Sequence, residues 1–238
     1  MYGVPHLLDD LGSLSPCARR FLAAHAERVP FDSAGDPGDQ ALGAMLLAFG
    51  HSDDAALRRL RAAQERYAGL RYRSEAWMFH EVIELGPWAS WDVADGEPIA
   101  EFVDHSVAHP YAVWMLGDGT IAYCFTGSGD PPIVRVFPHG EAMVESDALH
   151  HRSAGWTRIN RGDSGNVNVL ESAANASLRL IGEASGFTER WWSGDGFYIH
   201  VSRTEAAVFE DRRPIRWAIW GEDEAGVSQA RRFLATAI

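Results

Sequence analysis

The fold is decided by one stretch of sequence, LRRLRAAQERYAGLRYRSEAWMFHEVIEL, which covers residues 57–85. Its first part predicts an amphipathic helix, because Leu57, Leu60, Gln64 and Tyr67 recur on one helical face while arginine and glutamate fill the other. Gly69 follows the last turn, where glycine readily adopts the left-handed backbone angles that end a helix. We therefore expect a helix that stops at this glycine.

Aromatic and β-branched residues dominate the second part of the stretch. Residues 70–73 lead into residues 76–85, whose sequence AWMFHEVIEL is typical of a buried strand. A helix that packs on the sheet it feeds would form the nucleus of the core. We expect the sheet to begin near Tyr72.

The composition is that of an ordinary globular protein. The chain has 238 residues, of which 46% are hydrophobic and 23% charged, which is enough for one large domain or two small ones. Its formal net charge of -12 argues against a nucleic-acid or anionic-membrane surface, since both need basic patches. The charge fits a highly soluble protein and equally one that meets a basic partner.

Two features predict the compartment. Cys17 and Cys124 are too few for a disulfide framework or a zinc site. The opening residues, MYGVPH, lack the basic region and apolar run of a signal peptide, and no apolar segment approaches membrane-spanning length. We expect a cytoplasmic protein.

Helices are expected in the first third of the chain and a hairpin in the middle. Ser15 and Pro16 have the chemistry of a helix start, and residues 40–49 predict a second short helix before the one described above. Residues 111–116 and 120–125 flank an Asp-Gly turn at Asp118 and Gly119, which is the clearest hairpin in the sequence. Residues 133–137 predict a further strand.

The remaining elements complete an α+β pattern. Glu145-Ser146 and Glu171-Ser172 each resemble a strand end followed by a serine-capped helix, the helices stopping at Gly155 and Gly186. Strands are expected over residues 197–202, 206–209 and 215–220, and a closing helix over residues 223–237. We predict one domain over residues 1–238, with N-terminal helices (1–70) packed on a mostly antiparallel sheet with inserted helices (71–238).

Three of these elements resemble the SMI1/KNR4-type (SUKH) superfamily. Residues 60–72, LRAAQERYAGLRY, are similar to a helix that ends in an aromatic-Gly-Gly-Leu step before a first strand, with Ala68 in place of the first glycine. The Asp118-Gly119 hairpin and the junction at Glu145-Ser146 resemble later elements of that superfamily. The resemblance implies a non-enzymatic binding scaffold, often an immunity protein that neutralises a toxin, and it implies no catalytic residues.

The alternative function is a cofactor-free enzyme acting on a small aromatic or amine substrate. Alternation along residues 76–85 places one of His80 and Glu81 among apolar side chains, where its pKa would be displaced and suit general acid/base catalysis. In a condensation of the Pictet–Spengler type, Glu81 or Glu97 would be the acid/base and Arg73 would hold a substrate carboxylate. His200 lies opposite the apolar face of its strand and joins this candidate set.

Tryptophans are the candidate binding residues. Trp191 and Trp192 are adjacent and cannot both point inward from a strand packed on one face, and Trp88 and Trp91 lie in an aromatic loop, so these four are expected at a pocket or interface. An obligate homodimer without a ligand is a third possibility for such a surface.

No metal or cofactor is expected. Asp104, His105 and His109, and the pair His150-His151, are metal ligands by residue type, but no third ligand lies at a recognisable spacing. The sequence carries neither a phosphate-binding loop nor a dinucleotide fingerprint.

Overall fold

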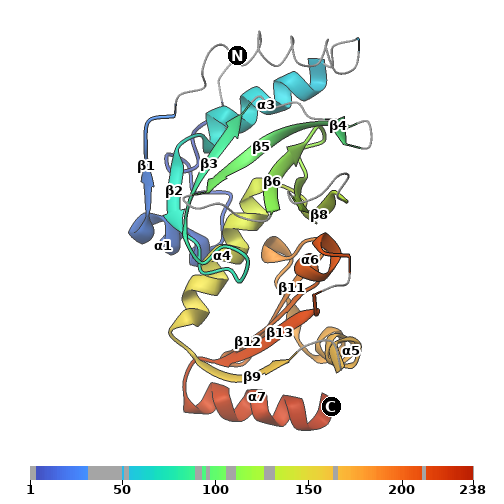
Figure 1. Cartoon of the computed structure of the whole chain (residues 1–238). Helices are drawn as coiled ribbons and strands as arrows, with labels where there is room; N and C mark the ends of the chain where they lie inside the picture. Colours follow the sequence, from blue (N-terminus) through green and yellow to red (C-terminus); the bar gives the residue numbers. More distant parts are fainter. Residues whose placement is uncertain are drawn as a thin grey trace.

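The computed structural model describes residues 4–31, 50, 54–88, 93–94, 97–105, 111–125, 132–162, 166–210 and 213–237. For residues 93–94, 97–99, 105 and 160–162 it describes the backbone alone. The strands form two antiparallel sheets, one above the other in Figure 1, and helices accompany both. The α+β class expected from the sequence is confirmed.

The first sheet is built before residue 138. Its strands are β1 (Ala26–Arg28), β2 (Leu70–Arg73), β3 (Val82–Trp88), β4 (Val93–Ala94), β5 (Glu97–His105), β6 (Tyr111–Leu116), β7 (Ile121–Phe125) and β8 (Val134–Phe137). They are hydrogen-bonded in the order β1-β2-β3-β5-β6-β7-β8, and β4 pairs with β5 outside this path.

The second sheet is built from the last third of the chain. Its strands are β9 (Thr157–Gly162), β10 (Arg179–Leu180), β11 (Glu189–Gly194), β12 (Phe197–Ser202) and β13 (Arg216–Gly221). They are hydrogen-bonded in the order β10-β11-β12-β13-β9. The first of these strands in the sequence, β9, therefore forms an edge of the sheet and pairs with the last, β13.

The helices cover the sheets and connect them. They are α1 (Pro16–His25), α3 (Asp54–Tyr67), α4 (Gly140–Ala154), α5 (Val167–Ser177), the short 3-10 helix η2 (Gly182–Ala184), α6 (Thr204–Val208) and α7 (Glu224–Ala237). In Figure 1, α3 lies over the first sheet, α7 lies under the second, and α4 passes from one sheet to the other.

Both sheets pack on α4. Met143 and Val144 of this helix lie in the core of the first sheet, whereas Leu149 packs with Trp191 and Trp220 of the second sheet. The helix therefore forms the wall between the two halves, and side chains on its inner face contact residues from both.

A second contact joins the halves at β8. The backbone N–H of Phe187 donates to the carbonyl of Val136 over 2.8 Å. A Cβ atom on Gly186 would lie 1.9 Å from the same carbonyl oxygen. The segment before β11 is thus pressed against the backbone of the first sheet, and glycine is required there.

The amphipathic helix and its glycine stop are confirmed. α3 buries Leu60 and Tyr67, as the helical pattern requires. Gly69 has a φ of +76°, and a Cβ atom there would lie 2.1 Å from the carbonyl oxygen of Val29. Both the backbone angle and the close approach exclude a larger residue.

Several other elements lie where the sequence places them. Ser15 caps α1 by accepting the N–H of Ala18 over 3.2 Å, and the hairpin of β6 and β7 turns at Gly119 with a φ of +92°. β8, β12, β13 and α7 also match their expected ranges within a few residues. The expected helix over residues 40–49 lies outside the described residues.

The long strand over residues 76–85 is wrong. β2 ends at Arg73 and β3 begins at Val82, and residues 74–81 form a loop between them. The N–H of Ser74 donates to the carbonyl of Glu81 over 2.8 Å, which closes the loop. The hydroxyl of Ser74 donates to the buried carboxylate of Asp147 over 2.8 Å. This distant polar partner outweighs the local strand pattern.

Three helix boundaries also differ from the sequence pattern. α4 begins at Gly140 with His139 as its cap, so Ser146 lies inside the helix, where its hydroxyl accepts the indole N–H of Trp191. α5 contains Ser172 and ends at Ser177, well before Gly186.

The expected strand over residues 206–209 is the short helix α6, which suits its alanines. Within the part expected to be helical, β1 pairs with β2.

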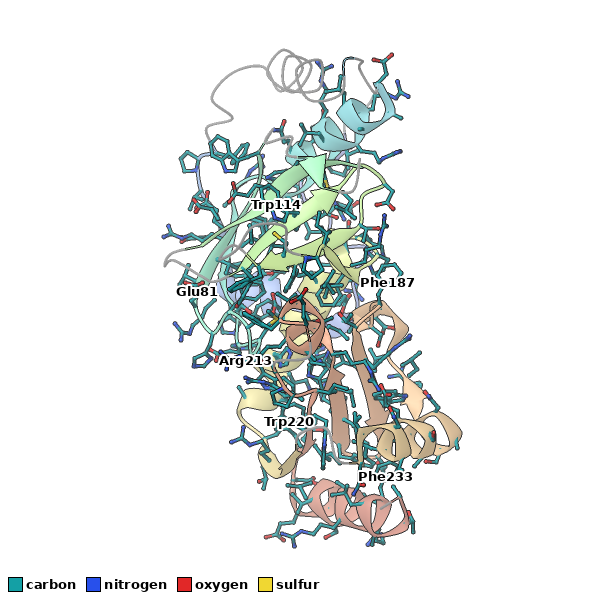
Figure 2. All side chains as sticks on the ribbon, turned by 45° about the vertical axis from the view of Figure 1, so that its right-hand side comes forward. Glu81, Trp114, Phe187, Arg213, Trp220 and Phe233 are labelled. Carbon is teal, nitrogen blue, oxygen red and sulfur yellow. The ribbon has the colours of Figure 1, made fainter. Side chains whose placement is uncertain are left out.

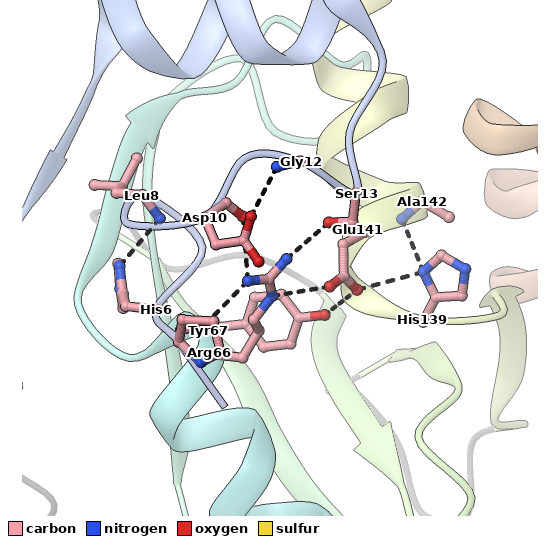
Figure 3. A network of polar contacts seen from close by, with 11 residues as sticks. His6, Leu8, Asp10, Gly12, Ser13, Arg66, Tyr67, His139, Glu141 and Ala142 are labelled. Atoms are coloured by element: carbon pink, nitrogen blue, oxygen red, sulfur yellow. Dashed lines mark hydrogen bonds and ion pairs between the residues drawn. The ribbon is translucent and has the colours of Figure 1, made fainter. Parts of the chain in front are cut away.

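One buried guanidinium ties the N-terminal segment to α3 and α4 (Figure 3). Arg66 donates to the carbonyls of Pro5 and Asp10 and to the hydroxyl of Ser13, over 3.0, 3.3 and 2.8 Å. Its Nε donates to Glu141 over 3.1 Å, and the hydroxyl of Tyr67 donates to the same carboxylate. Burial raises the pKa of Glu141, but hydrogen bonds from His139, Tyr67 and Arg66 outweigh it and hold the pKa at about 2.

We expect Arg66→Lys to lower the free energy of unfolding by roughly 2–3 kcal/mol, because an ammonium group cannot reach all four acceptors of the planar guanidinium. Urea denaturation at pH 7.5 measures the difference. Arg58→Lys on the exposed side of the same helix is the control and should change stability by less than about 0.5 kcal/mol. Equal stability of the two variants would contradict this role for Arg66.

Candidate functional site

A small cavity lies between the two sheets, and we call it the chamber. Its volume is about 30 Å³, which is room for one or two water molecules. Its lining comes from the 74–81 loop (Ala76, Trp77, Met78, Phe79), the first sheet and the turn after it (Tyr123, Phe137), α4 (Met143, Ser146, Asp147, His150) and the second sheet (Glu189, His200, Ser202).

Helical and strand periodicity bring the polar residues of the chamber together. On α4, Met143, Asp147 and His150 follow one another at spacings of four and three, which places them on one face. In the second sheet, Glu189 pairs with Ser202 across β11 and β12, and both point to the same face as His200.

Glu189 is a buried carboxylate that accepts three hydrogen bonds. One oxygen lies 2.6 Å from Nε2 of His200, and the other accepts the hydroxyls of Ser202, over 2.6 Å, and Thr204. Three donors suit an ionised carboxylate, which is an acceptor only. The proton of the His200 ring is therefore assigned to Nε2, because this nitrogen faces the carboxylate.

In the neutral ring, this assignment makes Nδ1 of His200 an acceptor. His200 is 1% exposed, and Nδ1 has no hydrogen-bond partner in the described part of the chain. The ring stacks on Trp191 with centroids 4.1 Å apart and contacts Trp77 at 4.8 Å and His150 at 4.7 Å. Aromatic rings thus fix the imidazole in place.

Burial shifts the pKa of two further ionisable groups of the chamber toward the neutral form. Asp147 is 2% exposed and accepts the hydroxyls of Tyr72 and Ser74, each over 2.8 Å. Burial raises the pKa of Asp147 to about 6 despite these two hydrogen bonds. Burial lowers the pKa of His150 well below its usual value, so its imidazole is neutral at pH 7.

An open cleft adjoins the chamber, and we call it the indole cleft. Its volume is about 370 Å³. It is lined by Glu75, Trp77, His80, His150, Ser153, Ala154, Trp156, Arg158 and Trp220. Because Trp77 and His150 line both spaces, these two side chains form the boundary between the cleft and the chamber. In Figure 2, Trp220 lies in the half of the molecule that contains the second sheet.

The indole cleft combines aromatic walls with a charged rim. Trp156 stacks on Tyr198 with centroids 4.7 Å apart, and the guanidinium of Arg152 lies 5.1 and 5.5 Å from these two rings. Glu75 at the rim pairs with both Arg73, over 3.0 Å, and His80, over 2.9 Å.

The ionisable residues singled out from the sequence do not meet at one site. Arg73 and His80 are exposed, both pair with Glu75 at the rim of the cleft, and Arg73 also donates to the carbonyl of His80 over 3.3 Å. Glu81 is buried but lines neither the chamber nor the cleft, and Figure 2 shows it at the first sheet. His200 belongs to the chamber. The side chain of Glu97 lies outside the described residues.

Of the tryptophans singled out from the sequence, Trp191 and Trp192 are buried, and Trp192 also lines an open cleft of about 440 Å³ with Asn175 and Arg190. Trp191 and Trp192 are both fully buried because the second sheet is covered on both faces, by α4 and η2 on one and by α5 and α7 on the other. Trp88 is half-buried against Phe31, with ring centroids 5.0 Å apart. Trp91 lies outside the described residues. The indoles of the cleft come from other positions, Trp77, Trp156 and Trp220.

Asp147 and Glu189 are the site residues that sequence reasoning missed. The helical face that holds Asp147 and His150 was detectable once α4 was known to begin at Gly140, but the serine-cap interpretation hid it. Glu189 comes two residues before Trp191 and acquires its role only through the register of β11 with β12. Among the described side chains, no group of three His, Cys, Asp or Glu residues could hold a metal ion.

We expect Asp147→Asn to change how stability depends on pH. The folded chain binds a proton on Asp147 near pH 6 and the unfolded chain only near 3.8, so lowering the pH between these values stabilises the wild type. From pH 7.5 to 4.5 its free energy of unfolding should gain about 2 kcal/mol relative to the Asn variant. Urea denaturation across this range measures the gain. Asp195→Asn, at an exposed turn, is the control, and parallel curves for Asp147→Asn and wild type would refute the assignment.

Comparison with known proteins adds no relative. No family model matches the chain, and no curated protein or solved structure matches it either. In the described ranges, no helix is long and apolar enough to cross a membrane. The function of the site is therefore argued from its own residues.

Proposed function

We propose that this protein is a binding protein and that it holds a small aromatic molecule in the indole cleft. The observation that carries the proposal is the convergence of Trp77, Trp156 and Trp220 on one cleft beside a buried polar chamber. A volume of about 370 Å³ lies within the range of small-molecule sites, which are typically lined by aromatic side chains with a few polar groups.

The aromatic walls are held in position before a ligand arrives. Tyr198 and Arg152 support Trp156, and Trp77 lies 6.3 Å from Trp220 between ring centroids, with their planes 34° apart. Fixed walls reduce the entropy lost on binding, since few side chains must be ordered. A planar ring can stack on such walls, and each aromatic pair contributes about 0.5–1.5 kcal/mol beyond the area that it buries.

The proposal is consistent with the binding scaffold that the SUKH resemblance implies, but with a small molecule as the ligand. We also propose that the protein works in the cytoplasm, because the sequence carries only two cysteines and no cysteine framework.

We expect indole to bind with one site per chain, as measured by isothermal titration calorimetry. Trp156→Leu should weaken this binding about tenfold, because it removes a stacking wall. Trp114→Leu is the matched control, since Trp114 is also half-buried but lies in the first sheet (Figure 2). The proposal fails if indole shows no saturable binding at millimolar concentration, or if both substitutions weaken it equally.

A protein partner is the second candidate function. The net charge of -12 favours it, since a toxin-neutralising protein of this charge would attract a basic surface. The test is complex formation, by size-exclusion chromatography, with a basic protein encoded beside this chain. Dissociation of the complex at high salt would support the charge argument, and elution of two separate proteins would contradict it.

A further inference from the structure

The chamber contains hydrogen-bond acceptors and negative charge without a matching cation. Asp147 and Glu189 are both buried carboxylates, and neither Lys nor Arg lines the chamber among the described residues. Asp147 receives hydrogen bonds only from the neutral hydroxyls of Tyr72 and Ser74. Burying a carboxylate without a positive partner costs several kcal/mol, so the arrangement destabilises the protein on its own.

His200 adds an independent sign that a donor belongs in the chamber. Its Nδ1 is fully buried and has no partner in the described part of the chain. In the neutral ring with its proton on Nε2, toward Glu189, Nδ1 presents a lone pair and accepts a hydrogen bond. An unpaired buried polar atom is rare in folded proteins and calls for a ligand or a water molecule.

The His150 ring extends the acceptor surface to the boundary with the cleft. Burial keeps this imidazole neutral. The hydroxyl of Tyr123 lies near Asp147 and Glu189, and these carboxylates and burial raise its pKa well above 10, so it stays protonated. The neutral chamber groups can therefore complete the coordination of a cation without adding positive charge.

We propose that the chamber binds the ammonium group of a primary amine whose aromatic ring lies in the indole cleft. This inference rests on the proposed function and names its ligand class. One N–H would donate to Nδ1 of His200 and another to the carboxylate of Asp147, which retains lone pairs beyond the two hydrogen bonds that it already accepts. The third N–H would face His150 or Tyr123 at the boundary.

The size and the position of the chamber fit this ligand. An ammonium head is close to a water molecule in size, and the chamber has room for one or two waters. Trp77 and His150 line both spaces, so a short chain passing between them joins a ring in the cleft to a head in the chamber. The net charge of -12 raises the local concentration of a cationic ligand at moderate salt.

Other head groups fit less well. A carboxylate would face the negative charges of Asp147 and Glu189, and like-charge repulsion opposes it. A hydroxyl has one proton to give and would leave either Nδ1 of His200 or Asp147 without its bond. A metal ion finds no group of three ligands of the usual kinds among the described residues.

The test compares tryptamine with its alcohol analogue, 2-(indol-3-yl)ethanol, and with indole, by isothermal titration calorimetry at pH 7.5. We expect tryptamine to bind at least tenfold more tightly than the alcohol. Asp147→Asn should remove most of this preference. Asp195→Asn, at an exposed turn, should change neither affinity. Circular dichroism confirms that each variant is folded.

The number of protons released on binding is a second measurement, and a purely structural role of Asp147 would not change it. At pH 6, Asp147 is partly protonated, and a neighbouring ammonium favours its ionised form. Tryptamine binding should then release protons, detected by repeating the titration in buffers of different ionisation enthalpy, and the alcohol should release none.

The outcomes separate the two proposals. If indole, tryptamine and the alcohol all fail to bind, the aromatic cleft function is wrong and the ammonium site falls with it. If all three bind with similar affinity, the cleft function stands and the ammonium site is overturned. Tryptamine binding that is tight but unchanged by Asp147→Asn also overturns it, because the head group is then outside the chamber.

Discussion

The hydrogen bonds that Asp147 accepts hold the centre of this protein together. One carboxylate on α4 receives the hydroxyl of Tyr72 from β2 and that of Ser74 from the following loop. Both donors lie more than seventy residues away in the sequence, so the bonds fix the helix against the first sheet. They also end β2 early and turn the 74–81 loop toward the second sheet, where Trp77 contacts His200 and Trp220. The chamber and the indole cleft both follow from this turn.

The second sheet also contributes a buried carboxylate, that of Glu189. Glu189 accepts hydrogen bonds from Nε2 of His200 and from the hydroxyls of Ser202 and Thr204. All three residues lie within fifteen positions of it in the sequence. Asp147 and Glu189 thus approach the same space from opposite sides, each satisfied by neutral donors or by an imidazole. Such an arrangement favours a unique geometry over maximal stability, because apolar residues of the same volume would cost less to bury.

Local sequence patterns predicted the elements whose causes are local. Leu60 and Tyr67 mark the helical face of α3, and Gly69 and Gly119 supply the left-handed angles that a helix end and a hairpin need. The strand over residues 76–85 failed because its competitor, Asp147, is remote in sequence. The order in which the strands pair could not be predicted from the sequence either. Alternation of apolar and polar residues shows which face of a strand is buried, but not which strands share a sheet.

The site was accessible from sequence only in part. His200 stood out as an ionisable residue inside an apolar strand, and it does line the chamber. Its partner Glu189 needed the register of β11 with β12. Trp191 and Trp192 are both buried because this sheet is covered on two faces, and Trp192 also lines an open cleft with Asn175 and Arg190. Trp77 lies in the loop over residues 74–81, where the sequence predicts a strand, and this loop brings it to both the chamber and the cleft.

The contact between Gly186 and Val136 holds the two sheets closely packed against each other. A backbone carbonyl of β8 sits where a side chain at position 186 would be, so the segment leading into β11 fits against the first sheet without clearance. Backbone atoms cannot rearrange as side chains do, and a methyl group added here would act as a wedge. It would separate β8 from β11 and widen the space between Phe137 and Glu189, two walls of the chamber. The absence of a side chain at position 186 therefore keeps Phe137 and Glu189 close together, although Gly186 itself does not line the chamber.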